Sequence, residues 1–303
     1  MADYFGASIR RREDPRLLRG RGRYVDDIVR PGMLHCAFVR SRHPSARIRS
    51  INVSSGLAVE GVVAVLTFAD LQRWMMPLPS FGAIPPMLGE RVVMAVNRPR
   101  QFPLVNDVAR YAGQCLAIVV AESAAAAHAG VHAIEVQYEP LSAVMDVLGA
   151  CTPDAPRVHR EWNDNIAVAF NHSIGEPERV FREAEHRLRE TFHIQRYAGM
   201  PIETRGVVAE YDQGLDALTS WTGTQIPHFV QQHLTDVFGL APHNVRVTAP
   251  DVGGGFGTKV SCYPEDVLVP LTARVVGRPV KWIESRTEHF VASAHARDQG
   301  ARC

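Results

Sequence analysis

The segment Asp251-Val252-Gly253-Gly254-Gly255-Phe256-Gly257-Thr258-Lys259 constrains the fold of this 303-residue chain most strongly. It holds four glycines in five positions, which lets the backbone take positive φ angles and approach a ligand closely. Consecutive N–H groups in such a loop can form a concavity that binds anions. A Walker loop does not fit, because Val260 rather than Ser or Thr follows Lys259. A Rossmann motif does not fit either, because position 258 is not glycine. The residues alone leave two interpretations open, an anion-binding loop and a tight turn after a strand.

The first half of the chain is predicted to mix strands with a helix. Apolar and β-branched runs predict strands between Met33 and Thr67 and over Cys115–Ala121. An alanine-rich helix over Glu122–His132 and a strand over Ile134–Tyr138 follow. This spacing predicts either a βαβ crossover or a unit in which the helix packs on one face of a sheet. The stretch from Met75 to Pro86 is rich in Pro, Met and Gly and predicts an exposed loop.

A stretch with two prolines, Cys151–Pro156, predicts a linker between two domains at residues 1–150 and 151–303. In the second domain, Pro and Gly positions and apolar periodicity set the expected boundaries of helices and strands. The predicted elements are helices over 178–185, 227–238 and 265–276, strands over 187–195 and 245–247, and a hairpin of 207–211 with 217–221.

The composition excludes several classes of protein. A net charge of +1 indicates neither a nucleic-acid nor a membrane-surface partner. The five cysteines form no C-x-x-C pair, so neither a zinc nor an iron–sulfur site is expected in this chain. Arg10-Arg11-Arg12 is followed by Glu13-Asp14-Pro15 and not by an apolar core, so no export signal is expected. The longest apolar stretch, Leu116 to Ala121, is too short to span a bilayer. We therefore expect a cytoplasmic protein.

A second segment, Thr222-Gly223-Thr224-Gln225-Ile226-Pro227-His228, places Gln225 just before a predicted helix. Its amide could reach into a cleft there, although a capping or surface role is commoner for such a residue.

In this order and spacing, Gln225 and the glycine-rich segment resemble the molybdenum-cofactor-binding large subunit of the xanthine dehydrogenase, aldehyde oxidase and carbon-monoxide dehydrogenase family. In that family a Thr-Gln segment precedes a Gly-Gly-Phe-Gly loop. Other segments similar to the family are Arg12-Glu13-Asp14, Tyr24-Val25-Asp26-Asp27, Arg40-Ser41-Arg42-His43-Pro44, Tyr138-Glu139-Pro140-Leu141, Pro201-Ile202-Glu203-Thr204-Arg205-Gly206 and Arg278-Pro279-Val280-Lys281-Trp282. The resemblance implies an α+β fold, with an N-terminal α/β hammerhead domain followed by the first part of a molybdopterin-binding domain.

The same resemblance implies a molybdopterin-dependent oxidoreductase that hydroxylates or oxidises a small-molecule substrate with oxygen from water. In the family a pterin dithiolene, expected here as the cytosine dinucleotide, holds the molybdenum. Gln225 would donate a hydrogen bond to an oxygen ligand of the metal, which makes it the catalytic candidate and a cofactor-binding one. Gly254, Gly255, Phe256 and Gly257 are the other cofactor-binding candidates, with Phe256 lining the substrate channel. No residue of this chain is expected to ligate the metal.

The resemblance also implies two partner subunits, a small one with [2Fe-2S] clusters and a medium one with FAD, which carry electrons away. Val260 stands where purine-oxidising members commonly have a glutamate, which argues against xanthine and favours the carbon-monoxide dehydrogenase type. Glu203 and Arg205 are expected to form a structural ion pair, the alternative being that they orient the glycine-rich loop.

In the family, the catalytic glutamate base and most loops that grip the dinucleotide would lie beyond residue 303. The ending Gly300-Ala301-Arg302-Cys303 is expected to mark a truncation. Three hypotheses follow: a large-subunit fragment completed by a separate C-terminal chain, a catalytically silent truncation product, or a stand-alone module that binds an anion or nucleotide. If the second domain is incomplete, the helix over 265–276 is expected to leave an apolar patch exposed.

Overall fold

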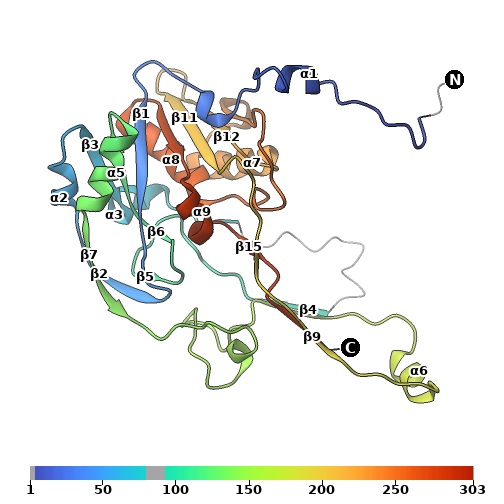
Figure 1. Ribbon diagram of the computed structural model, residues 1–303. Helices are drawn as coiled ribbons and strands as arrows, with labels where there is room; N and C mark the ends of the chain where they lie inside the picture. Colours follow the sequence, from blue (N-terminus) through green and yellow to red (C-terminus); the bar gives the residue numbers. More distant parts are fainter. Residues whose placement is uncertain (1–3, 80–92, 303) are drawn as a thin grey trace.

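The computed structural model describes residues 4–79 and 93–302. Its main feature is a seven-stranded mixed sheet in the order β13-β12-β11-β14-β1-β6-β3 (Figure 1). The strands from the second half of the chain are β11 (Gly206–Asp212), β12 (Ala217–Thr222), β13 (Val245–Thr248) and β14 (Val280–Ile283). Those from the first half are β1 (Leu34–Arg40), β3 (Val62–Thr67) and β6 (Cys115–Ala121).

The two halves of the chain meet where β1 pairs in parallel with β14. Leu34 lies opposite Val280 there, and His35 lies opposite Lys281. On its other edge β1 pairs antiparallel with β6, which in turn pairs with β3. One continuous sheet therefore contains strands from before and after residue 150. The division into domains at 1–150 and 151–303 stays a prediction.

Strand β6 is buried along its whole length, as its continuous apolar run predicted. Ile118 and Val120 pack into a core with Leu268 and Trp282 from the second half. Val119 points to the opposite face, where it joins a separate core beneath a smaller sheet. Both faces of this strand are covered, which is why its residues do not alternate between apolar and polar.

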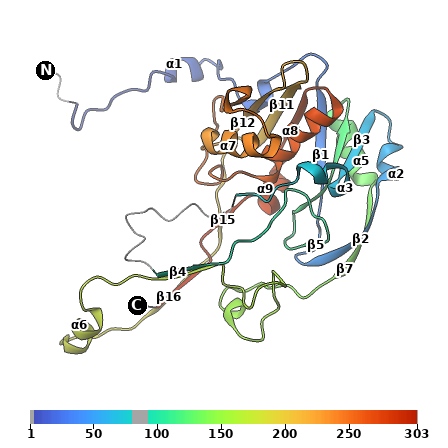
Figure 2. The ribbon, with the colours of Figure 1, turned by 180° about the vertical axis from the view of Figure 1, so that it is seen from behind.

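Helices α7 (Pro227–Phe238) and α8 (Pro264–Val276) cover one face of the sheet, as seen from behind in Figure 2. Each begins with proline in its first turn and ends at a glycine in the left-handed conformation, so both predicted helices are confirmed. Residues 264–273 of α8 are all buried. The expectation that this helix would expose an apolar patch is therefore wrong, since β11, β14 and α7 already enclose it.

On the other face, α5 (Ala124–Ala133) packs against β1 and β6. It begins two residues later than predicted, because Ser123 caps it: the Ser123 side chain accepts from the Ala126 N–H. The next strand, β7 (Glu135–Pro140), joins β2 (Ala46–Asn52) and β5 (Val108–Ala109) in a separate three-stranded sheet. A βαβ crossover within one sheet is therefore wrong, and the alternative, a helix on one face of a sheet, is confirmed.

In the second half the predicted hairpin is confirmed, because β11 pairs antiparallel with β12 around a turn in which Asp212 accepts from the N–H groups of Gly214 and Leu215. The predicted strand over 187–195 is shorter than expected. The remaining strands form pairs: β4 (Val93–Val96) with β8 (Val168–Asn171), β9 (Thr191–Ile194) with β16 (Gln299–Arg302), and β10 (Tyr197–Ala198) with β15 (His295–Ala296).

The shorter helices connect these elements or extend from the body. They are α1 (Asp14–Leu17), α2 (Val53–Leu57), α3 (Phe68–Leu71), α6 (Pro177–Glu183) and α9 (Arg286–Ala292), with 3-10 turns at Val25–Asp27, Gln72–Trp74, Gly149–Cys151 and Pro242–Asn244. From Met75 to residue 79 the chain is a loop, and residues 80–86 of the predicted loop lie outside the described residues.

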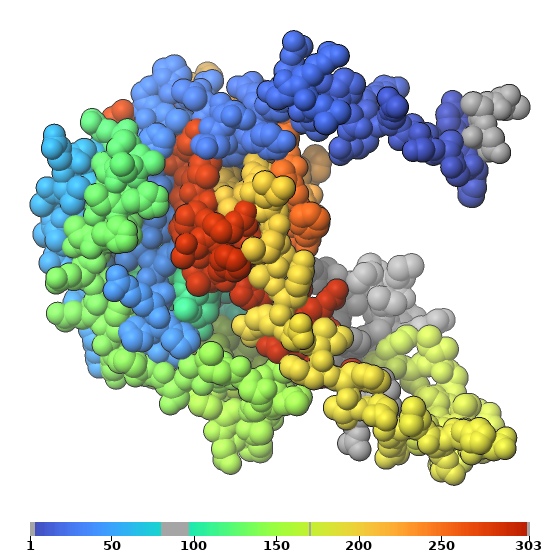
Figure 3. All heavy atoms as spheres, in the orientation of Figure 1, coloured from blue at the N-terminus to red at the C-terminus, as the bar shows by residue number. Residues whose placement is uncertain are grey.

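Two segments extend away from the body (Figure 3). One is the N-terminal arm, which contains α1, and the other is a stalk made of α6 with the β9–β16 ribbon. All four residues of β9 are exposed, including Phe192 and Ile194. Phe192 and Ile194 of this stalk are thus among the exposed apolar side chains of the second half, whereas residues 264–273 of α8 are buried. No helix among residues 4–79 and 93–302 is long and apolar enough to cross a membrane.

A buried ionic network fastens the sheet to α8 and α9. Arg205, just before β11, pairs with Glu265 at 2.9 Å and with Glu284. Arg40 on β1 reaches the other oxygen of Glu265 at 2.8 Å. Burial alone raises the pKa of Glu265, but the guanidinium groups of Arg205 and Arg40 outweigh it and lower that pKa to about 2. His289 on α9 completes the network through its 2.8 Å contact with Glu284.

We expect Ile118→Ala to lower the free energy of unfolding by about 2–5 kcal/mol, because Ile118 is fully buried and its truncation leaves a cavity. If both halves share one core, the urea midpoints measured by tryptophan fluorescence and by circular dichroism should fall together, since three of the four tryptophans, Trp162, Trp221 and Trp282, lie in the second half. The control is Val63→Ala, at a side chain 46% exposed. A urea midpoint by fluorescence that is the same in Ile118→Ala as in the wild type would contradict a shared core.

Candidate functional site

The glycine-rich loop runs from the end of β13 to the start of α8, at one end of the α7–α8 layer. Gly254 and Gly257 take positive φ angles of 98° and 81°, and Phe256 takes a φ of 50°. A phenylalanine in the left-handed region costs on the order of 1 kcal/mol, so the surrounding contacts hold this conformation. As a result the Phe256 ring stands 72% exposed at the tip of the loop.

Glu203 anchors the first part of the loop. Its carboxylate oxygen Oε2 accepts from the Gly253 N–H at 2.7 Å and from Lys259 Nζ at 2.8 Å. Its own N–H donates to the Gly253 carbonyl at 3.1 Å. The expected structural ion pair between Glu203 and Arg205 is therefore wrong, since Arg205 pairs with Glu265 and Glu284. For Glu203 the alternative, that it orients the loop, is what the structure shows.

Lys259, at the end of the loop, points into the protein and pairs with Glu203. Its side chain is fully buried, and Glu203 is the carboxylate that compensates its charge within the described residues. Its carbonyl accepts from the Gln225 N–H at 2.8 Å, which fixes the segment before α7 against the loop. A buried ammonium is tolerated because it is paired, and the pair spans the loop from its first glycine to its last residue.

The N-terminal arm ties down the loop's first residue. Arg16 forms a bidentate pair with Asp251, at 2.6 and 2.7 Å. The Arg23 N–H donates to the same carboxylate at 2.7 Å. The Arg16 hydrogen bond, followed by that of Arg23, lowers the pKa of Asp251 to about 2. Asp251 is therefore ionised at neutral pH.

Gln225 lies directly against the loop. The Gly257 N–H donates to Gln225 Oε1 at 3.2 Å, and a Cβ at Gly255 would come within 2.5 Å of the Gln225 amide carbon. Only glycine at position 255 allows this approach. Because Oε1 accepts this bond, the donors that remain available on the exposed Gln225 side chain are those of Nε2. Within the described residues Nε2 has no hydrogen-bond partner.

Three further donors stand beside this amide. The N–H groups of Gly254, Gly255 and Phe256 form no hydrogen bond within residues 4–79 and 93–302. Consecutive free N–H groups in a loop with alternating φ signs suit an anion. Together with Gln225 they make a set of neutral donors on an exposed surface, so the residues present fit an anionic metal–oxo cofactor without adding a charge.

A buried carboxylate, Asp266, supports the loop from behind. Its oxygens accept from the Thr222 hydroxyl at 2.7 Å and from the Tyr263 N–H at 2.9 Å. Burial raises the pKa of Asp266 to about 6 against the lowering effect of these hydrogen bonds. Tyr263 in turn donates its hydroxyl hydrogen to the Thr258 carbonyl, so this cluster holds the second part of the loop.

The structure thus brings all five sequence-predicted site residues together: Gln225, Gly254, Gly255, Phe256 and Gly257. That they bind the cofactor stays a prediction. Sequence reasoning missed the roles of Lys259 and Asp251 as anchors, and Asp266 was not considered. The signal available for Lys259 was its position two residues after the last glycine of the loop and five residues before the first residue of α8. No group of three or more His, Cys, Asp or Glu side chains that could hold a metal ion occurs in the part of the chain that the structure describes.

Comparison with known families identifies two domains. The family model for the aldehyde oxidase and xanthine dehydrogenase a/b hammerhead domain matches residues 19–142. The model for the molybdopterin cofactor-binding domain matches residues 158–303. The two matches agree with the sequence-based interpretation of the fold and together cover most of the chain.

Individual proteins with related sequences include two large subunits. The nicotine 6-hydroxylase large subunit of Paenarthrobacter nicotinovorans is 36% identical, over 97% of this chain and 35% of that protein. The carbon monoxide dehydrogenase large chain of Afipia carboxidovorans is 37% identical, over 97% and 36%. Among solved structures, quinoline 2-oxidoreductase from Pseudomonas putida superposes with a TM-score of 0.84 at 37% identity, over 97% and 36% of the two chains. The chain therefore spans about a third of the length of these relatives.

We expect Glu203→Gln to lower the free energy of unfolding by on the order of 3 kcal/mol, because it leaves the buried Lys259 ammonium without a counter-charge. Adding Lys259→Met should restore most of this loss, as a double-mutant cycle in urea would measure. The matched control is Glu210→Gln, which removes the half-exposed pair with Arg30 and should cost about 1 kcal/mol. Equal effects of Glu203→Gln and Glu210→Gln would contradict the anchoring role.

Asp266 makes stability depend on pH. Its pKa is raised from 3.8 in the unfolded chain to about 6 in the fold, so its stabilising effect is complete below pH 3.8 and is lost as the pH rises through 6. Relative to the wild type, Asp266→Asn should become more stable between about pH 4 and about pH 7.5, by on the order of 3 kcal/mol. Urea unfolding of both proteins at each pH checks this. A stability difference that does not change with pH would contradict it.

Proposed function

Because the chain belongs to the aldehyde oxidase and xanthine dehydrogenase family of molybdopterin-binding large subunits, we propose that it forms one wall of a molybdenum–pterin active site in an oxidoreductase. The proposed reaction is the oxidative hydroxylation or oxidation of a small molecule, with water as the source of oxygen. The observation that carries the proposal is the available Nε2 of Gln225 beside the free N–H groups of Gly254, Gly255 and Phe256.

When bound, the cofactor would supply the two-electron redox chemistry and the oxygen ligand that is transferred. Gln225 would donate a hydrogen bond through Nε2 to an oxygen ligand of the metal, and the loop N–H groups would contribute to holding the cofactor. These donors are fixed before binding, because Glu203 and Lys259 clamp the loop and Gly257 orients the Gln225 amide. Donors that need no rearrangement during the reaction stabilise developing charge most effectively.

Phe256 and Val260 would shape the substrate channel. Both side chains stand on the exposed surface of the loop, 72% and 50% exposed. An apolar wall excludes water and strengthens hydrogen bonds made behind it. Val260 offers no hydrogen bond to a purine, which supports a substrate of the carbon-monoxide, aldehyde or simple N-heterocycle type. The names of the related carbon monoxide dehydrogenase and quinoline oxidoreductase fit this class.

The complete assembly is proposed from the relatives. The pterin would be the cytosine dinucleotide, and a [2Fe-2S] small subunit and an FAD medium subunit would accept the electrons in the cytoplasm. The remaining two thirds of a large subunit, which the relatives contain and residues 1–303 do not match, would supply the catalytic base and the opposite wall. The competing hypotheses are a silent truncation product and a stand-alone anion-binding module.

The first test is metal and pterin analysis of the chain purified alone, and again after co-expression with a polypeptide that carries the rest of the family's large subunit. Molybdenum and pterin that appear only after co-expression support a site shared by the two segments. No cofactor under either condition supports a silent truncation product and overturns the proposal.

In such a loaded complex, we expect Gln225→Ala to lower kcat by on the order of a hundredfold, as removal of one preorganised donor does. Molybdenum content should change little, because the loop N–H groups remain. Gln232→Ala is the matched control, since that amide bonds Asp236 on the outer face of α7. A kcat for Gln225→Ala equal to that of the control would contradict the assigned role.

A further inference from the structure

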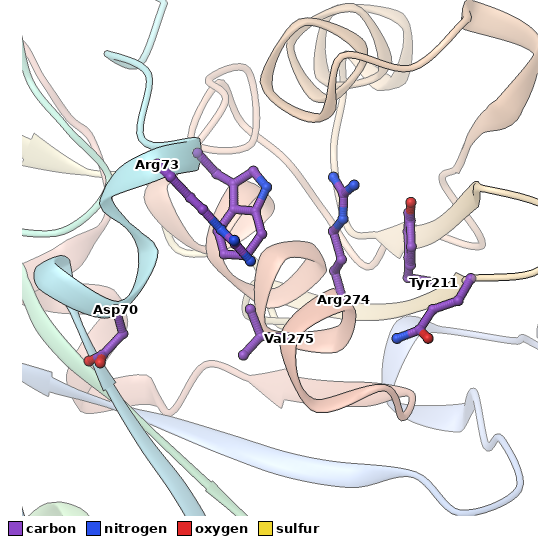
Figure 4. Close-up of a pocket in the computed structure, with 7 residues that line it drawn as sticks. Asp70, Arg73, Tyr211, Arg274 and Val275 are labelled. Atoms are coloured by element: carbon purple, nitrogen blue, oxygen red, sulfur yellow. The ribbon is translucent and has the colours of Figure 1, made fainter.

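A second concave site lies at the opposite end of α8 from the glycine-rich loop. It is an open hollow of about 630 Å³, shown in Figure 4. Trp74 and Arg73 come from the 3-10 turn after α3, Tyr211 and Gln213 from the end of β11 and its turn, and Arg274 from the last turn of α8. The loop lies before the first residue of α8, so the hollow is separate from the proposed active site.

Arg73 and Arg274 both lie within cation–π distance of the Trp74 ring in this hollow. The Arg73 guanidinium lies 3.7 Å from the centroid of the Trp74 ring. The Arg274 guanidinium lies 5.8 Å from the same ring and 4.8 Å from the Tyr211 ring. Stacking on aromatic rings holds each guanidinium plane but leaves its N–H donors unused.

Neither arginine has a counter-ion among residues 4–79 and 93–302. Each guanidinium carries five N–H donors. Within this part of the chain Arg73 and Arg274 contact aromatic rings, and none of their donors binds a carboxylate or carbonyl. Asp70 also lines the hollow, but its carboxylate accepts from the Thr67 N–H and hydroxyl, both at 2.7 Å. Figure 4 shows Asp70 at the far end from Arg274 and Tyr211.

Two like charges on one ring repel each other, and this repulsion is relieved when an anion binds near both. Trp74, Tyr211 and Val275 add aromatic and aliphatic atoms to the lining beside those donors. An arginine fork favours a carboxylate or phosphate, which it can bind with two parallel hydrogen bonds.

We propose that this hollow binds an anion carried on a flat ring, either a nucleotide phosphate or an aromatic carboxylate. Arg73 and Arg274 bind the anionic group, and the ring lies in the hollow beside Trp74 and Tyr211. The site does not depend on the molybdenum cofactor, so it exists whether or not the proposed function is correct.

The test uses the 303-residue chain and four probes: AMP, benzoate, adenosine and inorganic phosphate. Isothermal titration calorimetry at low salt measures each affinity, because screening weakens such contacts at high salt. A ring-bearing anion should bind at least about tenfold more tightly than both adenosine and inorganic phosphate. Tighter binding of AMP identifies a nucleotide site, and tighter binding of benzoate identifies a site for aromatic acids.

Variants locate the binding site. Arg73→Ala and Arg274→Ala should each weaken the tighter probe by about tenfold or more, while Arg274→Lys should weaken it less. Arg73 is exposed, so its replacement should leave folding intact. The control is Arg278→Ala, whose guanidinium donates to the Gly32 carbonyl and does not line the hollow.

Two results would overturn the proposal. One is that neither AMP nor benzoate binds more tightly than adenosine and inorganic phosphate. The other is that Arg73→Ala, with an unchanged circular dichroism spectrum, binds the tighter probe as well as Arg278→Ala does.

Discussion

The buried guanidinium of Arg205 is the contact on which the rest of this structure depends. It lies 3.8 Å from the Tyr263 ring centroid and 5.4 Å from that of Trp282. At its edge it pairs with Glu265 at the start of α8 and with Glu284 after β14. Removing one member of such a network leaves an uncompensated buried charge, which costs several kcal/mol. The network therefore fixes α8, α9 and the central strands in one arrangement.

The position of the glycine-rich loop follows from this arrangement. Glu203 stands two residues before Arg205, and Lys259 stands six residues before Glu265. Glu203 and Lys259 are thus both close in sequence to residues of the network. Their ion pair, together with the Glu203 bond to the Gly253 N–H, holds both ends of the loop. Between these fixed points Gly254, Gly255 and Phe256 keep their N–H groups free. A rigid base with an open tip is what a preorganised binding loop requires.

Local signals made part of the fold predictable. Helix α7 was expected over its observed residues because Pro227 starts it and Gly239, at a φ of 64°, ends it. Strand β6 was evident from its apolar run. The partner of β7, however, is β2 in a separate sheet, a pairing that spacing along the chain does not encode. The burial of α8 was also missed, because it depends on strands as distant along the chain as β1, whose Arg40 is 225 residues from Glu265.

In the candidate site, too, the sequence predicted the local segments but not the contacts between distant residues. Resemblance to the family pointed to Gln225 and the Gly254–Gly257 segment, but not to what holds them. Glu203 and Lys259 are 56 residues apart, and Arg16 and Asp251 are 235 apart. No periodic pattern in the sequence predicts such pairs. A charged residue near a loop is also more often exposed to solvent than buried. Only the three-dimensional arrangement distinguishes Glu203 as a loop anchor from Arg205 as a core residue.

A crystal structure of the chain assembled with the rest of a large subunit and loaded with cofactor tests the central claim most directly. The account predicts a cofactor oxygen within hydrogen-bond distance of Gln225 Nε2, with the N–H groups of Gly254 to Phe256 facing the cofactor and the Glu203–Lys259 pair intact. A cofactor bound elsewhere, or a Gln225 amide turned away from it, would contradict the account.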